Sequence, residues 1–353
     1  MSHTYDEILS QPEAWEGALR VARAVWTRPP RVLALDGRER FLTVGSGTSF
    51  YLAQVAAHVL QERTRRPASA VAASEVFLSA ASTVPADEPL VAFVFSRSGS
   101  TSEAVLAAQH LREHRPGARV VAVTCRSGSE LAEHADLAIE IPEADERSVV
   151  MTRSFTSMLV ALGVVAAAIV GDRVALAELE RLPELAHDGM EAAETFGQRL
   201  GEDLTLDAFV HLGLGPNHGL AQEATLKLKE MTQVRCEAYG PLEFRHGPIS
   251  IVEPGTAVVL LGGCREESYL PDLERELARH GAHVAKVSPH ASDVADTSLV
   301  LPAGLSDVAR APLYLPAVQL TAYHRARSLG LNPDEPRNLD QVVVLDSIGG
   351  HEA

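Results

Sequence analysis

Residues 209–248 read FVHLGLGPNHGLAQEATLKLKEMTQVRCEAYGPLEFRHGP, and the interpretation of the chain starts from this stretch. A short apolar run at its start predicts a strand, and a sharp turn follows at Gly213 and Gly215. The next residues predict a helix from about His218 to about Gln233. A strand, a glycine turn and a helix in this order are typical of an α/β fold.

Charged side chains on this helix and in the loop after it indicate a catalytic site. Glu223, Lys227 and Glu230 are spaced by four and three residues, so they lie on one face of the helix. The following loop carries Glu243 and His246. A carboxylate, an ammonium and an imidazole are groups that move protons on a small polar substrate. The same spacing is also typical of a solvated surface pair, so the interpretation depends on the rest of the chain.

Composition excludes several classes of partner. The chain has 353 residues, 46% hydrophobic and 22% charged, which predicts two globular domains of ordinary size. A net charge of -16 argues against nucleic acid and anionic membranes, but not against a small phosphorylated metabolite. Residues 158–170 are the most apolar run and predict a buried helix rather than a membrane span.

Cysteine usage and the N-terminal residues predict a cytoplasmic protein. Cys125, Cys236 and Cys264 are too few and too scattered for a disulfide framework or a structural zinc site. Reduced thiols are then the default. Residues 1–19 lack the basic and apolar regions of a signal peptide.

Apolar strands alternate with helices along the first half. This alternation predicts a parallel sheet covered by helices on both faces. Strands are expected at 41–44, 71–73, 90–95, 119–124 and 137–141, and helices at 1–28, 45–61, 101–114 and 129–134.

The pattern then recurs. VGSGTSFYLAQVA at 44–56 matches LGLGPNHGLAQEA at 212–224, an offset of 168, and ADLAIEIP at 135–142 matches ADTSLVLP at 295–302. We therefore expect a duplicated three-layer α/β/α fold, each copy with a mainly parallel, doubly wound sheet. The predicted divisions are an N-terminal helix (1–29), a first domain (30–170), connecting helices (171–199), a second domain (200–345) and a C-terminal tail (346–353).

The two copies differ in their chemistry. SRSGST follows the apolar strand of the first copy at 96–101, whereas GGCREE stands at 262–267 in the second. In the first copy Val59 stands opposite Lys227, and Glu62 stands opposite Glu230 without a lysine. The sequence therefore predicts one site that combines an anion loop from the first copy with proton-transfer groups from the second.

Ser96, Ser98 and Thr101 are the predicted anion-binding residues. They lie where a strand meets a helix N-terminus, where backbone N–H groups and the helix dipole favour a dianion. An ordinary serine-rich helix cap is the alternative. The hydroxyls around Gly99 favour a phosphate group, and because neither a Walker lysine nor a G-x-G-x-x-G pattern is present, a nucleotide is not expected.

The motifs together resemble the tandem sugar isomerase (SIS) domain family. The chain looks like the isomerase domain of glucosamine-6-phosphate synthase and the stand-alone amino-sugar-phosphate deaminases and isomerases. The matching segments are GSGTS at 45–49, SRSGST at 96–101, MTRSFTSM at 151–158, EATLKLKEMT at 223–232, EAYGPLEFRHGP at 237–248 and PRNLDQVVVL at 336–345.

The resemblance implies roles for individual residues. Glu230 would shuttle the proton between C1 and C2 of the open-chain sugar, and Lys227 would neutralise the developing oxyanion. His246 would assist ring opening from the neighbouring subunit of a homodimer. No metal or organic cofactor is implied. The residues expected to bind the substrate and its phosphate are Gly47, Thr48, Ser49, Ser96, Arg97, Ser98, Thr101, Val149 and Glu243.

Two departures from the family limit the reaction. The synthase has a lysine in an R-N-L-A-K-S segment that forms a Schiff base with the keto sugar, and Gln341 stands at that position here. A glutamine-hydrolysing domain is also not expected. The predicted function is an amino-sugar-phosphate deaminase and isomerase, for example converting glucosamine 6-phosphate to fructose 6-phosphate and ammonia. The alternatives are a deglycase, a plain aldose–ketose isomerase and a phosphosugar-binding regulator without catalysis.

Overall fold

Two parallel five-stranded sheets form the frame of the protein. The computed structural model describes residues 2–27, 31–86 and 89–345, so the predicted C-terminal tail lies outside the described residues. Every strand pair in both sheets is parallel. The first sheet has the order β2 (Ala68–Ala72), β1 (Arg40–Gly45), β3 (Leu90–Phe95), β4 (Arg119–Thr124) and β5 (Leu137–Glu140).

The second sheet repeats this order, which confirms the predicted duplicated α/β fold. Its strands follow as β7 (Arg235–Tyr239), β6 (Ala208–Gly213), β8 (Thr256–Leu261), β9 (His283–Ser288) and β10 (Thr297–Val300). The bounds of β6 lie 168 positions after those of β1, which is the offset read from the sequence. The predicted domain boundaries remain a prediction, because the core between the sheets is shared.

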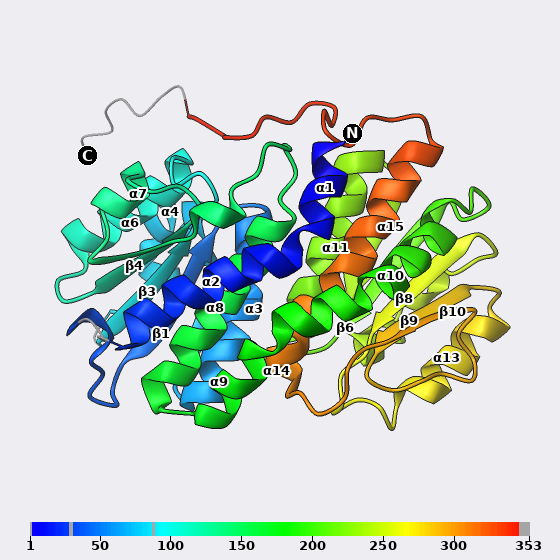
Figure 1. The fold of residues 1–353 in the computed structure, drawn as a ribbon, viewed down its shortest axis with the longest axis horizontal. Helices are drawn as coiled ribbons and strands as arrows, with labels where there is room; N and C mark the ends of the chain where they lie inside the picture. The colour runs from blue at the N-terminus through cyan, green and yellow to red at the C-terminus, as the bar shows by residue number, and fades with distance from the viewer. Residues whose placement is uncertain (1, 28–30, 87–88, 346–353) are drawn as a thin grey trace.

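Six long helices fill the space between the two sheets (Figure 1). They are α2 (Gln11–Thr27), α3 (Thr48–Thr64), α8 (Arg153–Val170), α10 (Leu182–Gly201), α11 (Pro216–Thr232) and α15 (Leu315–Ser328). The other helices are α1 (His3–Leu9), α4 (Ala73–Leu78), α5 (Ala80–Thr83), α6 (Ser102–His114), α7 (Glu130–Glu133), α9 (Arg173–Glu180), α12 (Pro241–Phe244), α13 (Leu270–Arg279) and α14 (Asp307–Arg310), with short 3₁₀ turns at η1 (Arg31–Leu33), η2 (Pro142–Ala144), η3 (Pro248–Ile251) and η4 (Ala311–Tyr314).

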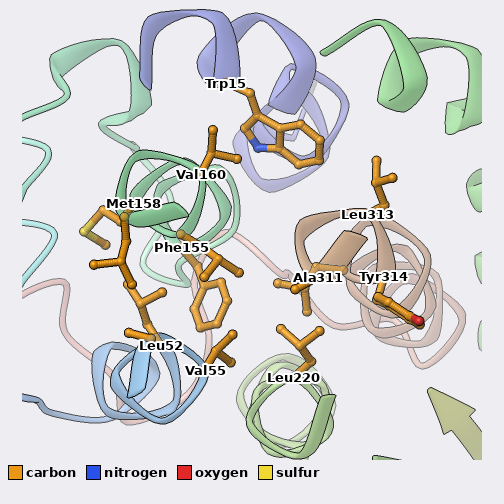
Figure 2. Packing of buried hydrophobic residues seen from close by; sticks show 14 of the residues in the cluster. Trp15, Leu52, Val55, Phe155, Met158, Val160, Leu220, Ala311, Leu313 and Tyr314 are labelled. Carbon is orange, nitrogen blue, oxygen red and sulfur yellow. The ribbon is translucent and has the colours of Figure 1, made fainter. Parts of the chain in front are cut away.

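One continuous hydrophobic cluster joins the halves through these helices. Phe155 of α8 points toward Val55 of α3, with Leu220 of α11 nearby (Figure 2). The helices α3 and α11 come so close that a Cβ atom at Gly219 would lie 2.7 Å from Cγ2 of Val55. This packing places the C-terminal part of α11 beside the N-terminal part of α3, which matters for the site.

Alternating side chains of each strand supply two different cores. In β3, Phe93 and Phe95 face the shared cluster, while Ala92 and Val94 face a separate cluster beneath α6. Because successive side chains point to opposite faces and helices cover both, every β3 position is buried.

The apolar helix α8 is buried, as predicted. By length and composition it is the one helix within the described ranges that would be able to span a membrane, but 78% of its residues are buried inside the protein. Such burial is that of a core helix.

Two local predictions need correction. The helix expected over 1–28 is interrupted at Ser10. The interruption arises because Pro12 has no N–H to donate to the carbonyl of Ile8. The side-chain amide of Gln11 donates to that carbonyl instead, at 2.9 Å. The strand expected at 71–73 is β2, which begins at Ala68 because pairing with β1 sets its extent and Ala73 already begins α4.

Candidate active site

The serine loop lies at the carboxyl end of the central strand β3. Ser96, Arg97 and Ser98 are buried there, directly before α6. The Oγ of Ser96 accepts from the N–H of Gly99 at 3.1 Å, and that of Ser98 accepts from the N–H of Ser100 at 3.2 Å. Accepting does not use the hydroxyl proton, so Ser98 keeps a donor for an anion.

The N-terminus of α3 opens at the same edge, beside this loop. Gly47 has a φ of 56°, which favours glycine, and Thr48 and Ser49 begin the helix in buried positions. A Cβ at Gly45 would lie 2.2 Å from the carbonyl oxygen of Ser49, so only glycine lets the helix start this close to the strand. Helix N-termini attract anions.

A cavity of about 270 Å³ lies between these two elements. Eight of the predicted residues line it: Gly47, Thr48, Ser49, Arg97, Ser98, Thr101, Val149 and Glu230. The residues that sequence reasoning did not assign to the site are Ser46, Glu103, Met151, Leu339, Asp340, Gln341 and Val343. Four of these seven come from the C-terminal segment, and the family motif at 336–345 is the sequence signal that points to them.

Lys227 connects the two halves behind the cavity wall. Its side chain is fully buried, and its Nζ lies 2.5 Å from Glu230 and 3.4 Å from Glu223. The same Nζ donates to Oγ1 of Thr48 at 3.0 Å. Thr48 opens α3 in the first half, whereas Lys227 belongs to α11 in the second, so the site is built from both copies.

Burial and charge act on this cluster in opposite directions. Burial raises the pKa of Glu223 to about 8, against the opposing charge of Lys227. Burial by itself lowers the pKa of Lys227, but the carboxylates of Glu223 and Glu230 outweigh it and hold that pKa above its usual value. Lys227 is therefore a fixed cation at neutral pH.

Arg97 lines the cavity, but its guanidinium is held by protein groups. It lies 3.5 Å from the buried carboxylate of Glu146 and donates to the carbonyls of Ser148 and Gln341, at 3.1 and 3.0 Å. Glu146 in turn accepts from the N–H and Oγ1 of Thr152, just before α8. Arg97 thus ties the serine loop to its surroundings, and its predicted phosphate contact remains a prediction.

The C-terminal segment crosses from α15 back to the first half (Figure 1). Its Gln341 donates from Nε2 to the carbonyl of Glu146 at 2.9 Å, and Arg126 donates to Gln341 Oε1 at 3.4 Å. Farther along, the N–H of Leu345 donates to Oγ of Ser102 at 3.1 Å. The segment therefore forms one wall of the cavity.

Glu243 and His246 do not reach this cavity within the chain. Both are exposed, at the end of α12 and just after it. The helix α11 ends at the amino edge of the second sheet, and β7 must cross the sheet before α12 begins at the carboxyl edge. Five strand residues at about 3.3 Å each separate the two edges by roughly 16 Å. Within a single chain this imidazole therefore lies away from Lys227 and Glu230. Its contribution from a neighbouring subunit remains a prediction, as does substrate binding by Glu243.

Ser96 itself does not line the cavity. Its hydroxyl donates to Oγ1 of Thr101 at 3.3 Å, and Thr101 lines the cavity. Ser96 therefore orients Thr101. Within the described ranges, no group of three or more His, Cys, Asp or Glu side chains is arranged to hold a metal ion.

Known proteins share this architecture. Residues 35–168 match the SIS domain family. Glutamine–fructose-6-phosphate aminotransferase (isomerizing) from Sulfurisphaera tokodaii is 29% identical over 314 residues, covering 88% of this chain and 51% of that protein. The chain thus spans about half the length of the curated relatives that it matches.

Two solved structures match almost the whole chain. Glucosamine-6-phosphate deaminase from Thermotoga maritima is 29% identical, with a TM-score of 0.78, over 98% of this chain and 100% of that chain. Tagatose-6-phosphate ketose/aldose isomerase from Escherichia coli is 25% identical, with a TM-score of 0.87, over 99% of this chain and 97% of that chain.

Proposed function

We propose that this chain, which belongs to the SIS domain family, is a phosphosugar isomerase that releases ammonia from an amino-sugar 6-phosphate such as glucosamine 6-phosphate. The reaction would move a proton between C1 and C2 and end in a ketose 6-phosphate. One observation carries the proposal: Glu230, paired with the buried Lys227, lines the same cavity as Ser98 and Thr101.

The proposed chemistry assigns one task to each end of the cavity. The serine loop and the N-terminus of α3 hold the phosphate with hydroxyl and N–H donors. Glu230 removes the proton from C2 of the open-chain amino aldose, which gives an enolamine. Lys227 lies beside Glu230 and stabilises negative charge that develops at the sugar oxygen. His246 of a neighbouring subunit would assist ring opening.

Proton return and water complete the reaction. Glu230 delivers the proton to C1, which leaves an imine at C2. One water then adds to the imine carbon, and ammonia leaves, so that the ketose phosphate remains. Each of these steps is a proton transfer, the addition of water or the loss of ammonia.

The presence of Gln341 supports a reaction that releases the amine. An amide side chain does not form a Schiff base, and its nitrogen already donates to the carbonyl of Glu146. A covalent route through a lysine at this position is therefore not proposed. The similarity to the deaminase from Thermotoga maritima points the same way.

A plain aldose–ketose isomerase is the second candidate. It is favoured by the likeness to tagatose-6-phosphate ketose/aldose isomerase, which extends over 99% of this chain. The same Glu230 would then act on a hydroxyl sugar, and no amine would be released.

One assay separates the two candidates. Purified protein is incubated with a panel of 2-amino-2-deoxyhexose 6-phosphates and with the corresponding hydroxyl sugars, and ammonia and ketose phosphate are measured in parallel. We expect equal amounts of ammonia and ketose phosphate from one amino sugar. Interconversion of the hydroxyl sugars without any ammonia would establish the second candidate, and turnover of neither class would contradict both.

A further inference from the structure

The charged side chains around the cavity are mostly acidic. Four ionisable side chains line it: Arg97, Glu103, Glu230 and Asp340. The charge of Arg97 is matched by Glu146, and that of Glu230 by Lys227. Asp340 is an exposed residue at the cavity wall, and among the described residues its carboxylate makes no hydrogen bond or ion pair. An uncompensated carboxylate at the wall of a small cavity raises the local preference for a cation.

Contacts of the C-terminal segment determine which of its side chains can bind a ligand in the cavity. Gln341 is held on both sides, because its backbone carbonyl accepts from Arg97 at 3.0 Å and its side-chain nitrogen donates to the carbonyl of Glu146 at 2.9 Å. Asn338 has a φ of 62°, a left-handed bend that asparagine tolerates better than most residues. Held between this bend and Gln341, Asp340 is the charged side chain that the segment brings to the wall.

A second acid, Glu103, lines the same cavity. Glu103 lies in the first turn of α6, and its Oε2 is buried without a hydrogen-bond partner among the described residues. A ligand with a phosphate and no positive charge would meet these acids without compensation. A ligand with a phosphate and an ammonium would satisfy both kinds of group at once.

We propose that Asp340 determines substrate specificity by binding a positively charged nitrogen group of the sugar phosphate. The inference rests on the proposed function and narrows its substrate class to sugar phosphates that carry an ammonium or alkylammonium group. Asp340 favours such substrates, and it disfavours uncharged sugar phosphates because its carboxylate would lose water without gaining a partner.

The variant Asp340→Asn tests this role. Dissociation constants are measured by calorimetry at pH 6.5 for glucosamine 6-phosphate, N-acetylglucosamine 6-phosphate and fructose 6-phosphate. We expect the wild type to bind the ammonium ligand about tenfold more tightly than the uncharged ones, and Asp340→Asn to weaken only the ammonium ligand, by about five- to tenfold. Asp340→Lys should reverse the preference, and KM for any substrate that turns over should follow the same order.

Glu335→Gln is the matched control, since Glu335 is an exposed carboxylate of the same segment that does not line the cavity. It removes the same charge and should change no dissociation constant by more than about twofold. Equal weakening of all three ligands by Asp340→Asn, or equal effects of both variants, would overturn the inference.

The binding measurements are independent of turnover. If no substrate is converted while the wild type still prefers the ammonium ligand and Asp340→Asn loses that preference, the proposed function fails and the inference stands. If substrates are converted but charged and uncharged ligands bind equally well to the wild type, the inference fails and the proposed function stands.

Discussion

The loops 96–101 and 262–267 occupy the same place in the two halves, at the carboxyl end of the central strands β3 and β8. In the first loop, serine and threonine side chains border a cavity. In the second, carboxylates of the chain itself take the backbone donors: the N–H of Gly263 donates to Glu266 at 2.8 Å, and that of Cys264 donates to Asp307 at 3.1 Å.

This contrast explains why a duplicated fold holds one such site. Both copies build an edge that attracts anions, because parallel strands and helix N-termini meet there. In the second copy, Glu266 and Asp307 occupy that edge, so a phosphate would meet negative charge. The remaining edge, in the first copy, is free for a ligand.

The helices α3 and α11 also differ in the chemistry of their corresponding side chains. By the offset of 168, Val55, Val59 and Glu62 of α3 stand where α11 has Glu223, Lys227 and Glu230. Both valines are buried, and Glu62 pairs with Arg265 at 2.8 Å. Proton-transfer groups are therefore present on one helix, and its counterpart has apolar packing and a surface ion pair.

The largest expected effect comes from Glu230→Gln compared with Glu62→Gln. Loss of the base should reduce kcat by about 10²- to 10⁴-fold, because the amide cannot accept the proton, while the dissociation constant for the sugar phosphate stays nearly unchanged. The counterpart variant should keep full kcat, since Glu62 lies outside the cavity. Similar losses in both variants, measured by product formation, would show that the two helices are not functionally distinct.

Mixing two inactive proteins tests whether the exposed carboxyl edge of the second half acts on a neighbouring subunit. His246→Ala and Glu230→Gln proteins are combined and allowed to exchange subunits. A shared site in a homodimer predicts recovery of roughly a quarter of the wild-type activity, because half the dimers are mixed and each has one complete site. If subunit exchange is demonstrated by native mass spectrometry and activity stays absent, His246 does not act across subunits.

Ser98→Ala and its counterpart Cys264→Ala compare the two loops directly. Removing a donor to a phosphate should raise the dissociation constant for the sugar phosphate by roughly tenfold or more, with a smaller change in kcat. Cys264→Ala should leave binding unchanged. A phosphate-free sugar serves as the control ligand, and equal weakening of its binding by Ser98→Ala would contradict the phosphate assignment.

The smallest expected effect concerns stability and pH. Burial raises the pKa of Glu223 to about 8 in the folded chain, from an ordinary value of 4.5. Between these values the folded state holds a proton that the unfolded state has released, so stability decreases as pH rises from about 4.5 toward about 8. Glu223→Gln should flatten this decrease in urea unfolding curves recorded across that range. An unchanged slope would show that Glu223 is ionised throughout.

Much of the frame follows from the sequence alone. The apolar strand at 90–95 and the offset of 168 predicted two parallel sheets, because alternation of strands and helices is a local pattern. The same pattern predicted that Glu223, Lys227 and Glu230 share a helix face. Of the predicted site residues, those near the ends of β1 and β3 lie together, since neighbouring parallel strands end at one edge.

Packing between distant elements determines which far-apart groups meet. Lys227 bonds to Thr48, 179 positions away, because α3 and α11 pack side by side. Asp340 and Gln341 line the cavity because the C-terminal segment returns to the first half. His246 lies at the opposite edge of the second sheet from Glu230, although only 16 residues separate them. Periodicity fixes which face of an element a side chain occupies, whereas packing between elements far apart in sequence decides what that face contacts.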